Sequence, residues 1–325
     1  MLETKFGIDT PKKIIISESE DYSEKAIARL SAFGEVVKLT SLDELEANLE
    51  TADILVVRLG LMLDAGVLSK ASQLKYILTP TTGLDHIDIN YTEKVGIKVI
   101  SLKGEQSYLD SIPSTAEHTM ALLLSIVRKV PFAFNHVLDY GWDRQAFRGN
   151  NLKGKKLGLL GFGRIGHQVA NYGFAFSMNV ATFDPDSTYI NPKVKFFTTP
   201  EELFSYSDIL CIHIPINEEN IHYISAEKIK FFKKGIILVN TSRGGVWDED
   251  EIAKDLKRGN IGAIATDVLE NEFDSHLRSQ SPLIALAKAG YPVLITPHIG
   301  GATYESMRET EDFIVDKFIN NLSVQ

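Results

Sequence analysis

Short apolar runs alternate with helix-like segments along most of the chain. In the first hundred residues, runs rich in isoleucine and valine predict strands at 13–17, 35–39, 52–57, 74–78 and 97–100. The segments between them predict helices at 23–33, 42–49, 64–71 and 88–96. Such alternation is typical of a parallel sheet flanked by helices. This region has no glycine-rich turn, so we expect it to bind a substrate rather than a nucleotide.

The alternation resumes after residue 151. Strands are predicted at 156–160, 180–183, 194–197, 209–214, 235–240, 263–268 and 293–298, and a final helix at 302–322. This helix has apolar residues at Phe313, Ile314, Phe318 and Ile319. We expect it to pack back on the first domain.

The segment 155–184 carries the most informative motif. An apolar strand runs directly into GFGRIG, where Gly161, Gly163 and Gly166 have the spacing of a dinucleotide-binding turn. The first glycine allows the tight turn, the second lets the backbone approach a pyrophosphate, and the third lets helix and strand pack closely. The helix that follows would offer its N-terminal N–H groups, at Arg164 and Ile165, to the phosphates.

A second strand follows this helix and ends at Asp184. A carboxylate at that place would accept hydrogen bonds from the adenosine ribose hydroxyls, which favours NAD over NADP. A plain strand–turn–helix unit is the alternative to a nucleotide site. The order of strand, helix, second strand and terminal acid favours the nucleotide site.

These patterns predict an α/β fold of two doubly wound parallel-sheet domains, and a length of 325 residues suits two domains. We expect a flavodoxin-like substrate-binding domain over 1–107, completed by a C-terminal helix within 299–325. A Rossmann NAD-binding domain is expected over 108–298.

A long helical stretch is predicted from Ser114 to Tyr140, broken at Pro131. Ser114 or Thr115 is expected to cap it. The apolar density of MALLLSIV, residues 120–127, exceeds a single amphipathic stripe. We therefore expect burial on several sides, partly by a second subunit of a homodimer.

Composition narrows the choice of partners. A formal net charge of −9 and a pI near 5.5 argue against nucleic-acid binding, which uses a basic face. The single cysteine, Cys211, cannot form an intrachain disulfide, and its apolar strand favours a buried core residue over a reactive thiol. Residues 1–11 contain no apolar signal core, and no apolar run approaches the ~20 residues that span a bilayer. We expect a cytoplasmic protein with no membrane association and no metal.

Polar residues directly follow three of the predicted strands. Arg243 follows the strand at 235–240, Asp267 and Glu272 follow the apolar run at 263–266, and His298 follows the run at 293–296. Ligands of doubly wound sheets bind beyond the carboxyl ends of the strands. The sequence therefore predicts a site at this edge.

These residue types suit the chemistry of a 2-oxo acid. Arg243 can hold a carboxylate and polarise a keto oxygen. His298 can protonate the developing alkoxide in reduction or accept the hydroxyl proton in oxidation. Glu272 can pair with His298, fix its tautomer and favour the imidazolium. Taken singly, Arg243 could be a surface ion pair and His298 a loop or capping residue, so the ordered set carries the interpretation.

The chain resembles the D-isomer-specific 2-hydroxyacid dehydrogenase family. The matching segments are LKGKKLGLLGFGRIG, HIPIN, KKGIILVNTSRGGVWDEDEI, GAIATDVLENE and VLITPHIGGAT, about half of the chain in family order. The resemblance implies an NAD-dependent oxidoreductase that transfers a hydride between NAD(H) and a small 2-hydroxy or 2-oxo acid. It implies that Arg243, Glu272 and His298 are catalytic, and that the chain forms a homodimer through the helices at 114–140.

The resemblance also implies which other residues touch the cofactor. Asp267 would hold the nicotinamide carboxamide, with Gly300 nearby. His213 to Pro215 would line the adenine side, and Thr241 and Ser242 would approach the nicotinamide ribose.

In the first domain, TTGLDHID resembles the family loop that binds the substrate carboxylate through backbone N–H groups. This places Thr81, Thr82 and Gly83 at the substrate. The family often has glycine in place of Thr81, so we expect a more closed loop.

Arg58 and Arg144 match family positions that reach the substrate. Two guanidinium groups suit a second anionic group and favour a phosphoglycerate-like substrate; surface ion pairs are the alternative. Thr79, where phosphoglycerate dehydrogenases usually carry another arginine, weakens that interpretation, and Phe273 replaces a usual proline.

Other functions stay open from the sequence. A glyoxylate or hydroxypyruvate reductase is one alternative, and a non-enzymatic NAD-sensing interaction protein is another. We expect no C-terminal regulatory domain, because the sequence ends soon after the last predicted helix.

Overall fold

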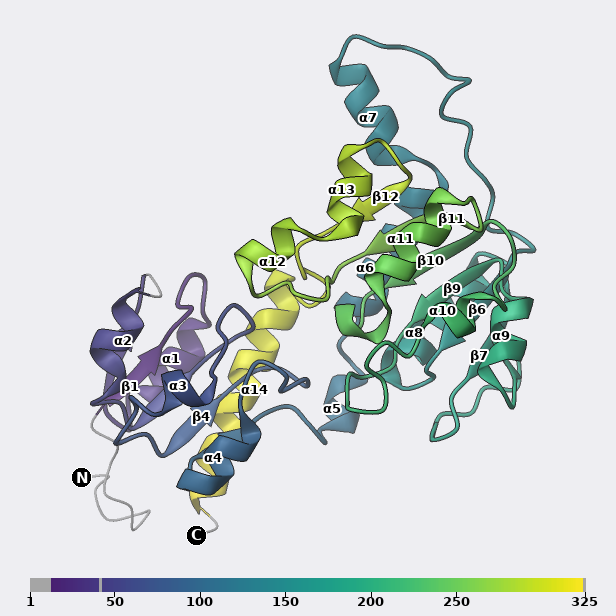
Figure 1. Cartoon of the computed structure of the whole chain (residues 1–325). Coiled ribbons are helices and arrows are strands. Elements are labelled where there is room, and N and C mark those ends of the chain that lie inside the picture. The colour runs from purple at the N-terminus through teal and green to yellow at the C-terminus, as the bar shows by residue number, and fades with distance from the viewer. Residues whose placement is uncertain (1–12, 41–42, 324–325) are drawn as a thin grey trace. The chain divides into compact units, whose positions relative to one another are not determined.

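The computed structural model describes residues 13–40 and 43–323 (Figure 1). It divides into two compact units: unit 1 comprises the described residues up to Leu109 and from Thr303 onward, and unit 2 is Asp110–Ala302. The N-terminal segment 1–11, in which we found no apolar signal core, lies outside the described residues.

Unit 1 contains a five-stranded parallel sheet in the order β2-β1-β3-β4-β5. Its strands are β1 Lys13–Ile16, β2 Glu35–Lys38, β3 Ile54–Val56, β4 Tyr76–Leu78 and β5 Lys98–Ile100. Its helices are α1 Glu24–Leu30, α2 Asp43–Leu49, α3 Ala65–Leu68, α4 Ile89–Val95, α5 Gln106–Leu109 and α14 Tyr304–Ser323. The five predicted strands are all present, and their order is that of flavodoxin-like sheets.

The core of unit 1 lies on both faces of its sheet, because successive residues of a strand point to opposite faces. Ile16 packs in an apolar cluster with Phe318 of α14. Its neighbour Ile15 packs with Leu49 of α2 in a second cluster. The C-terminal helix α14 is therefore part of the core of unit 1, although the whole of unit 2 separates it from the other elements in sequence.

Unit 2 contains a seven-stranded parallel sheet in the order β12-β11-β10-β9-β6-β7-β8. Its strands are β6 Lys156–Leu160, β7 Asn179–Phe183, β8 Lys195–Phe196, β9 Ile209–Ile212, β10 Ile236–Asn240, β11 Ile261–Thr266 and β12 Val293–Ile295. Its helices are α6 Ser114–Val127, α7 Val130–Leu138, α8 Arg164–Ala175, α9 Pro200–Tyr206, α10 Ala226–Ile229, α11 Glu249–Lys257, α12 Ser275–Ser279 and α13 Pro282–Lys288, with the 3-10 turn η1 Gly244–Val246. The strand order reverses between β6 and β9, and such a switch point is where doubly wound sheets bind nucleotides.

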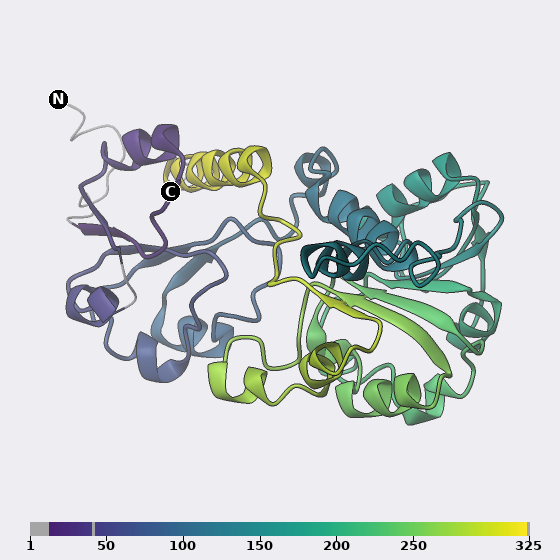
Figure 2. The same ribbon diagram turned by 90° about the horizontal axis from the view of Figure 1, so that it is seen from above.

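Helices cover both faces of the unit 2 sheet (Figure 2). Leu123 of α6 and Val169 of α8 belong to the apolar cluster on one face. Phe204 of α9, Ile252 of α11 and Leu283 of α13 belong to the cluster on the other. The predicted α/β fold of two parallel sheets flanked by helices is confirmed.

The helical stretch predicted over 114–140 forms two helices, α6 and α7, which meet at an angle of 60°. Lys129 at the join has a left-handed backbone with φ of 56°, and Pro131 occupies the first turn of α7. The prediction that Ser114 or Thr115 caps the stretch is wrong. Pro113 holds the cap position with a near-helical backbone and no side-chain cap bond, so the helix already includes both residues.

The two helices differ in burial. Met120 and Leu123 of α6 are 6% and 0% exposed, so unit 2 itself covers the apolar stretch that we had expected a second subunit to help bury. Helix α7 buries none of its residues; Phe134 and Leu138 are 61% and 60% exposed, and Figure 1 shows α7 projecting from the rest of unit 2. Within 13–40 and 43–323 no single helix is long and apolar enough to span a membrane. Helices α6 and α7 taken together do have that length and composition, but they are bent relative to each other.

Candidate active site

The polar residues predicted at three strand ends lie along one edge of the unit 2 sheet. Strands β10, β11 and β12 are neighbours, and Asn240, Thr266 and Ile295 near their ends are register partners. Beyond the strands, Asp267 N donates to Asn240 O at 2.9 Å, and His298 N donates to Asp267 O at 2.8 Å. The segments that carry the candidate residues therefore continue side by side.

His298 pairs with Glu272. Its Nδ1 lies 2.5 Å from Glu272 Oε1, and the two side chains are 21% and 14% exposed. A carboxylate only accepts hydrogen bonds, so Nδ1 carries the proton and donates it. Leu269 N donates to the other oxygen of Glu272 at 3.2 Å. Nε2 of His298 makes no hydrogen bond to any described residue, which leaves this atom available to a ligand.

Arg243 lies in the turn after β10 and is half-buried, and its Nη1 donates to Ser242 O at 2.8 Å. The next residue, Gly244, packs directly on the segment that leads to Glu272. A Cβ atom at Gly244 would lie 2.0 Å from the carbonyl carbon of Leu269, so only glycine fits. The Arg243 turn and the Glu272 segment are therefore held against each other.

Glu249, at the start of α11, supports the same segment. Its Oε1 accepts a hydrogen bond from Glu270 N at 2.9 Å, and its Oε2 accepts one from Ser281 Oγ at 2.7 Å. Burial raises the pKa of Glu249, and these hydrogen bonds only partly oppose that effect. We did not predict this residue; a second acid beside the helix-capping Asp248 was its only signal in the sequence.

Asp267, at the end of β11, is 2% exposed and holds several hydrogen bonds. Its Oδ1 accepts from Thr296 Oγ1 at 2.6 Å and from Ile299 N at 2.9 Å. The same oxygen lies 3.1 Å from His118 Nε2, while Oδ2 accepts from Gly300 N at 2.7 Å. Burial raises the pKa of Asp267, but the four hydrogen bonds outweigh it and hold that pKa below its usual value. The carboxylate is therefore charged at neutral pH.

The glycine turn joins β6 to α8 as the motif predicts. Gly161 has φ of 97°, and a Cβ atom there would lie 2.7 Å from His213 O. At Gly166 a Cβ atom would lie 2.3 Å from Gly161 O. At Gly163, apart from its neighbours in the chain, no atom of the described residues lies within 4 Å of the Cβ position, so the backbone there is open to a ligand.

The surroundings of the turn fit a dinucleotide. Helix α8 starts without a side-chain cap, and the N–H groups of Arg164 and Ile165 have no partner within the described chain. Both ring nitrogens of His213 are covered and unpartnered among the described residues, and burial lowers the pKa of His213 to about 3. Asp184 Oδ2 accepts from Phe162 N at 2.7 Å, which fixes the carboxylate beside the turn.

The guanidinium of Arg164 is engaged elsewhere: it donates to Ile112 O at 3.0 Å, and burial lowers its pKa. Any contact of Arg164 with a phosphate would therefore come from its backbone N–H.

Other predicted cofactor residues also lie at strand ends. Thr241 is 7% exposed, and its Oγ1 lies 2.7 Å from Thr119 Oγ1 of α6. Ser242 Oγ donates to Asn240 Oδ1 at 2.9 Å. Pro215 follows β9 and is exposed. These residues frame the edge to which the glycine turn also belongs.

In unit 1, the loop after β4 is closed by Thr81. Its Oγ1 donates to Gly83 O at 2.8 Å and lies 2.9 Å from Thr79 Oγ1. Thr82 between them is exposed.

Arg58, after β3, is bound to α14. Its Nε and Nη2 lie 2.8 and 2.5 Å from Glu311 Oε1, and its Nη1 donates to Glu20 O at 3.0 Å. The side chains of Arg58 and Glu311 are 16% and 1% exposed. These contacts favour the ion-pair alternative for Arg58 over binding of a substrate anion.

Arg144 lies in the segment between α7 and β6 that carries Tyr140 and Trp142, which are 100% and 88% exposed. It is exposed and makes no hydrogen bond or ion pair to the part of the chain that the structure describes. Nothing within unit 2 holds it at the strand-end residues.

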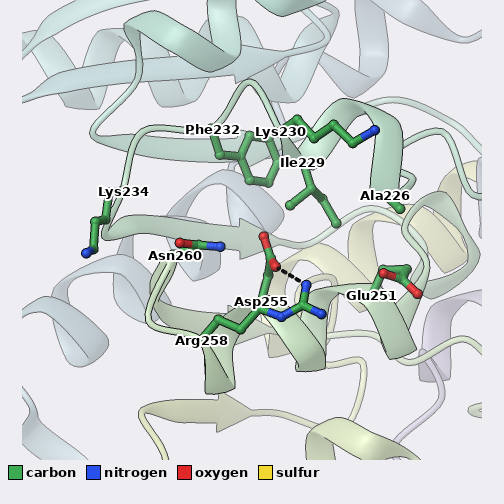
Figure 3. Close-up of a pocket in the computed structure, with 9 residues that line it drawn as sticks. All are labelled: Ala226, Ile229, Lys230, Phe232, Lys234, Glu251, Asp255, Arg258 and Asn260. Carbon is green, nitrogen blue, oxygen red and sulfur yellow. Dashed lines mark hydrogen bonds and ion pairs between the residues drawn. The ribbon is translucent and has the colours of Figure 1, made fainter.

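A pocket of about 360 Å³ lies at the opposite edge of the unit 2 sheet (Figure 3). It is lined by residues of α10 and α11 and by Lys234 and Asn260, which precede β10 and β11. Its Asp255 and Arg258 pair with each other at 3.2 Å. None of the candidate residues lines this pocket, and ligands of doubly wound sheets bind at the other edge.

Sequence reasoning missed the residues that α6 contributes. His118 contacts Asp267 and Thr119 contacts Thr241. Thr296, directly after β12, donates a hydrogen bond to Asp267. The available signal was the polar run Glu117 to Thr119, directly before the strongly apolar part of the helix at 120–127.

Known proteins share both the sequence and the fold. The profile described as D-isomer specific 2-hydroxyacid dehydrogenase, NAD binding domain, matches residues 120–300. A hydroxypyruvate reductase of Thermotoga maritima is 34% identical over 282 residues, covering 87% of this chain and 89% of that protein. A D-3-phosphoglycerate dehydrogenase of Methanocaldococcus jannaschii is 35% identical over 314 residues, which is 94% of this chain but only 56% of that protein. The crystal structure of Aquifex aeolicus D-lactate dehydrogenase with NAD and lactic acid has a TM-score of 0.78 and 29% identity, covering 95% of this chain and 96% of that one.

The chain belongs to the D-isomer-specific 2-hydroxyacid dehydrogenase family. It is an NAD-dependent oxidoreductase that acts on the CH–OH group of a small 2-hydroxy acid. The family, the cofactor and the reaction class predicted from the sequence are confirmed.

Proposed function

We propose that Arg243, Glu272 and His298 carry the substrate chemistry. In the reduction of a 2-oxo acid, Nε2 of His298 donates a proton to the oxygen that becomes the hydroxyl. Glu272, bonded to Nδ1, orients the ring and stabilises its positive charge. Arg243 binds the carboxylate with its planar fork of donors. The bound cofactor supplies the hydride. The observation that carries the proposal is the 2.5 Å contact between His298 and Glu272 beside the Arg243 turn.

The test is NADH oxidation, followed by absorbance, with a panel of 2-oxo acids. The variant Arg243→Ala removes the guanidinium group. It should lower kcat/KM by about 10- to 100-fold, because hydrogen bonds to charged groups contribute about 1.5–3 kcal/mol to binding. Arg258→Ala, which removes an exposed arginine directly after α11, is the matched control and should retain activity. Equal activity of the two variants would contradict the role of Arg243.

We propose that the glycine turn and the strand-end residues select NAD. The open N-terminus of α8 would receive the pyrophosphate, Asp184 the ribose hydroxyls, and Asp267 the nicotinamide carboxamide. A 2′-phosphate would meet the fixed negative charge of Asp184. NADH should therefore give at least ~10-fold higher kcat/KM than NADPH, a difference of about 1.4 kcal/mol. Equal values would show that Asp184 does not face the ribose.

We infer a substrate with an uncharged tail, of the hydroxypyruvate or glyoxylate type, rather than a phosphoglycerate-like one. Arg58, which we had considered for a second anion, is bound by Glu311 and the Glu20 carbonyl. The likeness to a hydroxypyruvate reductase along most of both chains supports the same choice. In unit 1, backbone N–H groups of the loop at 81–83 would bind the carboxylate.

The substrate is tested by comparing 3-phosphohydroxypyruvate, 2-oxoglutarate, hydroxypyruvate, glyoxylate and pyruvate with NADH, and then repeating the series with Arg58→Ala. We expect the acids with uncharged tails to react best, and the order of preference to stay the same in the variant. A preference for 3-phosphohydroxypyruvate that disappears in Arg58→Ala would restore the second-anion interpretation.

We propose a homodimer in which α7 packs against a second copy of the chain. Val130, Phe134, Val137 and Leu138 of α7 are each about half exposed or more, and Trp142 follows them. Exposed apolar patches of this kind mark interaction surfaces. Light scattering should give about twice the mass of 36.2 kDa, and Phe134→Asp should shift the mass toward that of one chain. A wild-type monomer at micromolar concentration would refute the dimer.

We infer a cytoplasmic location. Cys211 is buried, burial raises its pKa to about 12, and it has no cysteine to pair with. A chain with one inert thiol suits a reducing compartment. A fluorescent fusion that followed the cell envelope instead would contradict this.

A further inference from the structure

Helix α6 contributes two polar side chains to the edge of the unit 2 sheet that carries the candidate site. His118 Nε2 lies 3.1 Å from Asp267 Oδ1 and 3.0 Å from Thr296 Oγ1. The neighbouring Thr119 Oγ1 lies 2.7 Å from Thr241 Oγ1. The rest of α6 is mainly apolar and buried. Burial of a polar group destabilises the fold unless the group is hydrogen-bonded. We therefore attribute the presence of these two residues in α6 to their hydrogen-bond partners.

The network of His118, Thr296 and Asp267 has one consistent arrangement of protons. The single hydroxyl proton of Thr296 is donated to Asp267 Oδ1 at 2.6 Å. The Thr296 oxygen therefore accepts from His118 rather than donating to it. Nε2 of His118 must then carry a proton, which it shares between Thr296 Oγ1 and Asp267 Oδ1.

The two oxygens of Asp267 are used unequally. Oδ1 is contacted by three donors, from His118, Thr296 and Ile299, whereas among the described residues Oδ2 accepts only from Gly300 N. A carboxylate offers about four acceptor positions in all. Oδ1 is therefore fully used, and Oδ2 keeps one position for a ligand. Without the donor of His118, Oδ1 would keep only the donors of Thr296 and Ile299, so one of the contacts that hold the carboxylate in this orientation would be lost.

We propose that His118 is a positioning residue of the cofactor site. Its Nε2–H holds the carboxylate of Asp267 so that Oδ2 can accept a hydrogen bond from the N–H of the nicotinamide carboxamide. The inference rests on the proposed role of Asp267 toward the nicotinamide. In this proposal His118 makes no contact with the cofactor itself and acts through Asp267. Because its effect is limited to the nicotinamide end, binding of the adenosine and phosphate groups should not depend on it.

The test compares two ligands by calorimetry, NADH and ADP-ribose, which lacks the nicotinamide. His118→Phe keeps an aromatic ring of similar size and removes the donor. It should weaken NADH binding about tenfold, the effect of losing one hydrogen bond to a charged group, and leave ADP-ribose binding unchanged. His118→Gln places an amide N–H near the position of Nε2 and should restore NADH affinity to within about threefold of wild type. His276→Phe, at an exposed histidine of α12, is the matched control and should change neither affinity.

Each outcome has a defined meaning. Unchanged NADH affinity in His118→Phe, or an equal loss for both ligands, would overturn the positioning role. If His118→Phe does not fold, His118→Asn takes its place in the test. The shorter amide cannot reach Asp267, so this variant should show the same loss of affinity for NADH alone.

Wild-type and Asp267→Ala proteins separate the proposed role of Asp267 from that of His118. If NADH binds wild type no better than ADP-ribose, or Asp267→Ala has no effect, the role of Asp267 fails first. If Asp267→Ala weakens NADH binding alone and His118→Phe does not, only the inference about His118 fails.

Discussion

Two histidine–carboxylate pairs lie at the same edge of the unit 2 sheet, and they are built differently. His298 and Glu272 approach to 2.5 Å, and their side chains are 21% and 14% exposed. His118 and Asp267 are 3.1 Å apart, and their side chains are 16% and 2% exposed. In the first pair the carboxylate accepts one further hydrogen bond, from Leu269 N. In the second it accepts three further bonds, from Thr296, Ile299 and Gly300.

The number of donors around the carboxylate, rather than the residue types, separates the two pairs. Asp267 is surrounded by donors that hold its pKa low, so it provides a fixed negative charge. Glu272 has few other donors, and its negative charge is directed to a histidine ring whose Nε2 is open to a ligand. The arrangement around Asp267 suits the binding of a neutral or cationic group, and the pair of Glu272 and His298 suits proton transfer.

The largest expected effect concerns the proton-transfer pair. His298→Ala removes the proposed proton donor and should lower kcat for 2-oxo acid reduction by ~10²–10⁴-fold. NADH affinity should stay at the wild-type level, because the residue acts on the substrate. Steady-state rates and NADH calorimetry measure the two quantities. The comparison with His118→Phe, for which we expect the reverse pattern, makes the test specific. A His298→Ala variant that kept its kcat, or lost NADH binding instead, would show that the two pairs do not divide the work in this way.

The parts of this molecule that could be predicted from the sequence are those with local signals. Buried parallel strands are short apolar runs, so every predicted strand is found close to its predicted place. The glycine spacing likewise reports local geometry, since Gly161 needs a left-handed backbone and Gly166 has no room for a side chain. Residues at the ends of neighbouring strands come together as a direct result of the parallel sheet, which is why Glu272 and His298 could be paired.

The parts that could not be predicted depend on long-range packing. His118 and Asp267 are 149 positions apart, and no periodicity links a residue of α6 to the end of β11. Arg58 and Glu311 are 253 positions apart, so the sequence could suggest a substrate anion for Arg58 but not the carboxylate that binds it. The burial of 120–127 also depends on the covering elements, and unit 2 supplies them from its own sheet and α8.

A smaller effect is expected on the free energy of unfolding when the carboxylate of Asp267 is replaced. The pKa of Asp267 is lowered in the folded chain, so the residue stabilises the fold above its unfolded value of about 3.9. That contribution is lost as the pH falls through the lower folded value. Asp267→Asn should cost about 1–3 kcal/mol near pH 7, because donors that now face a carboxylate would meet a neutral amide. The difference from wild type should narrow below about pH 5.

Calorimetric unfolding of the apo proteins from pH 7 down to about pH 2 measures this, as a difference of several degrees that shrinks once the pH falls below the unfolded pKa. Asp250→Asn, at an exposed position of α11, is the control and should stay close to wild type throughout. A constant difference across the range would mean that the amide acts through packing rather than through the charge of Asp267.

The smallest effect expected is a partial loss of rate in Glu272→Gln. The amide oxygen can still accept the hydrogen bond from His298 Nδ1, but it carries no charge to stabilise the ring that donates the proton. We expect kcat/KM for 2-oxo acid reduction to fall by about three- to tenfold, or about 0.7–1.4 kcal/mol, with NADH affinity unchanged. Glu270→Gln is the matched control, because that carboxylate pairs with His222 at 2.7 Å and not with His298. Wild-type kcat/KM in Glu272→Gln would mean that the charge of Glu272 contributes nothing and that the residue only orients the ring. The contrast between the two pairs would then rest on the open Nε2 of His298.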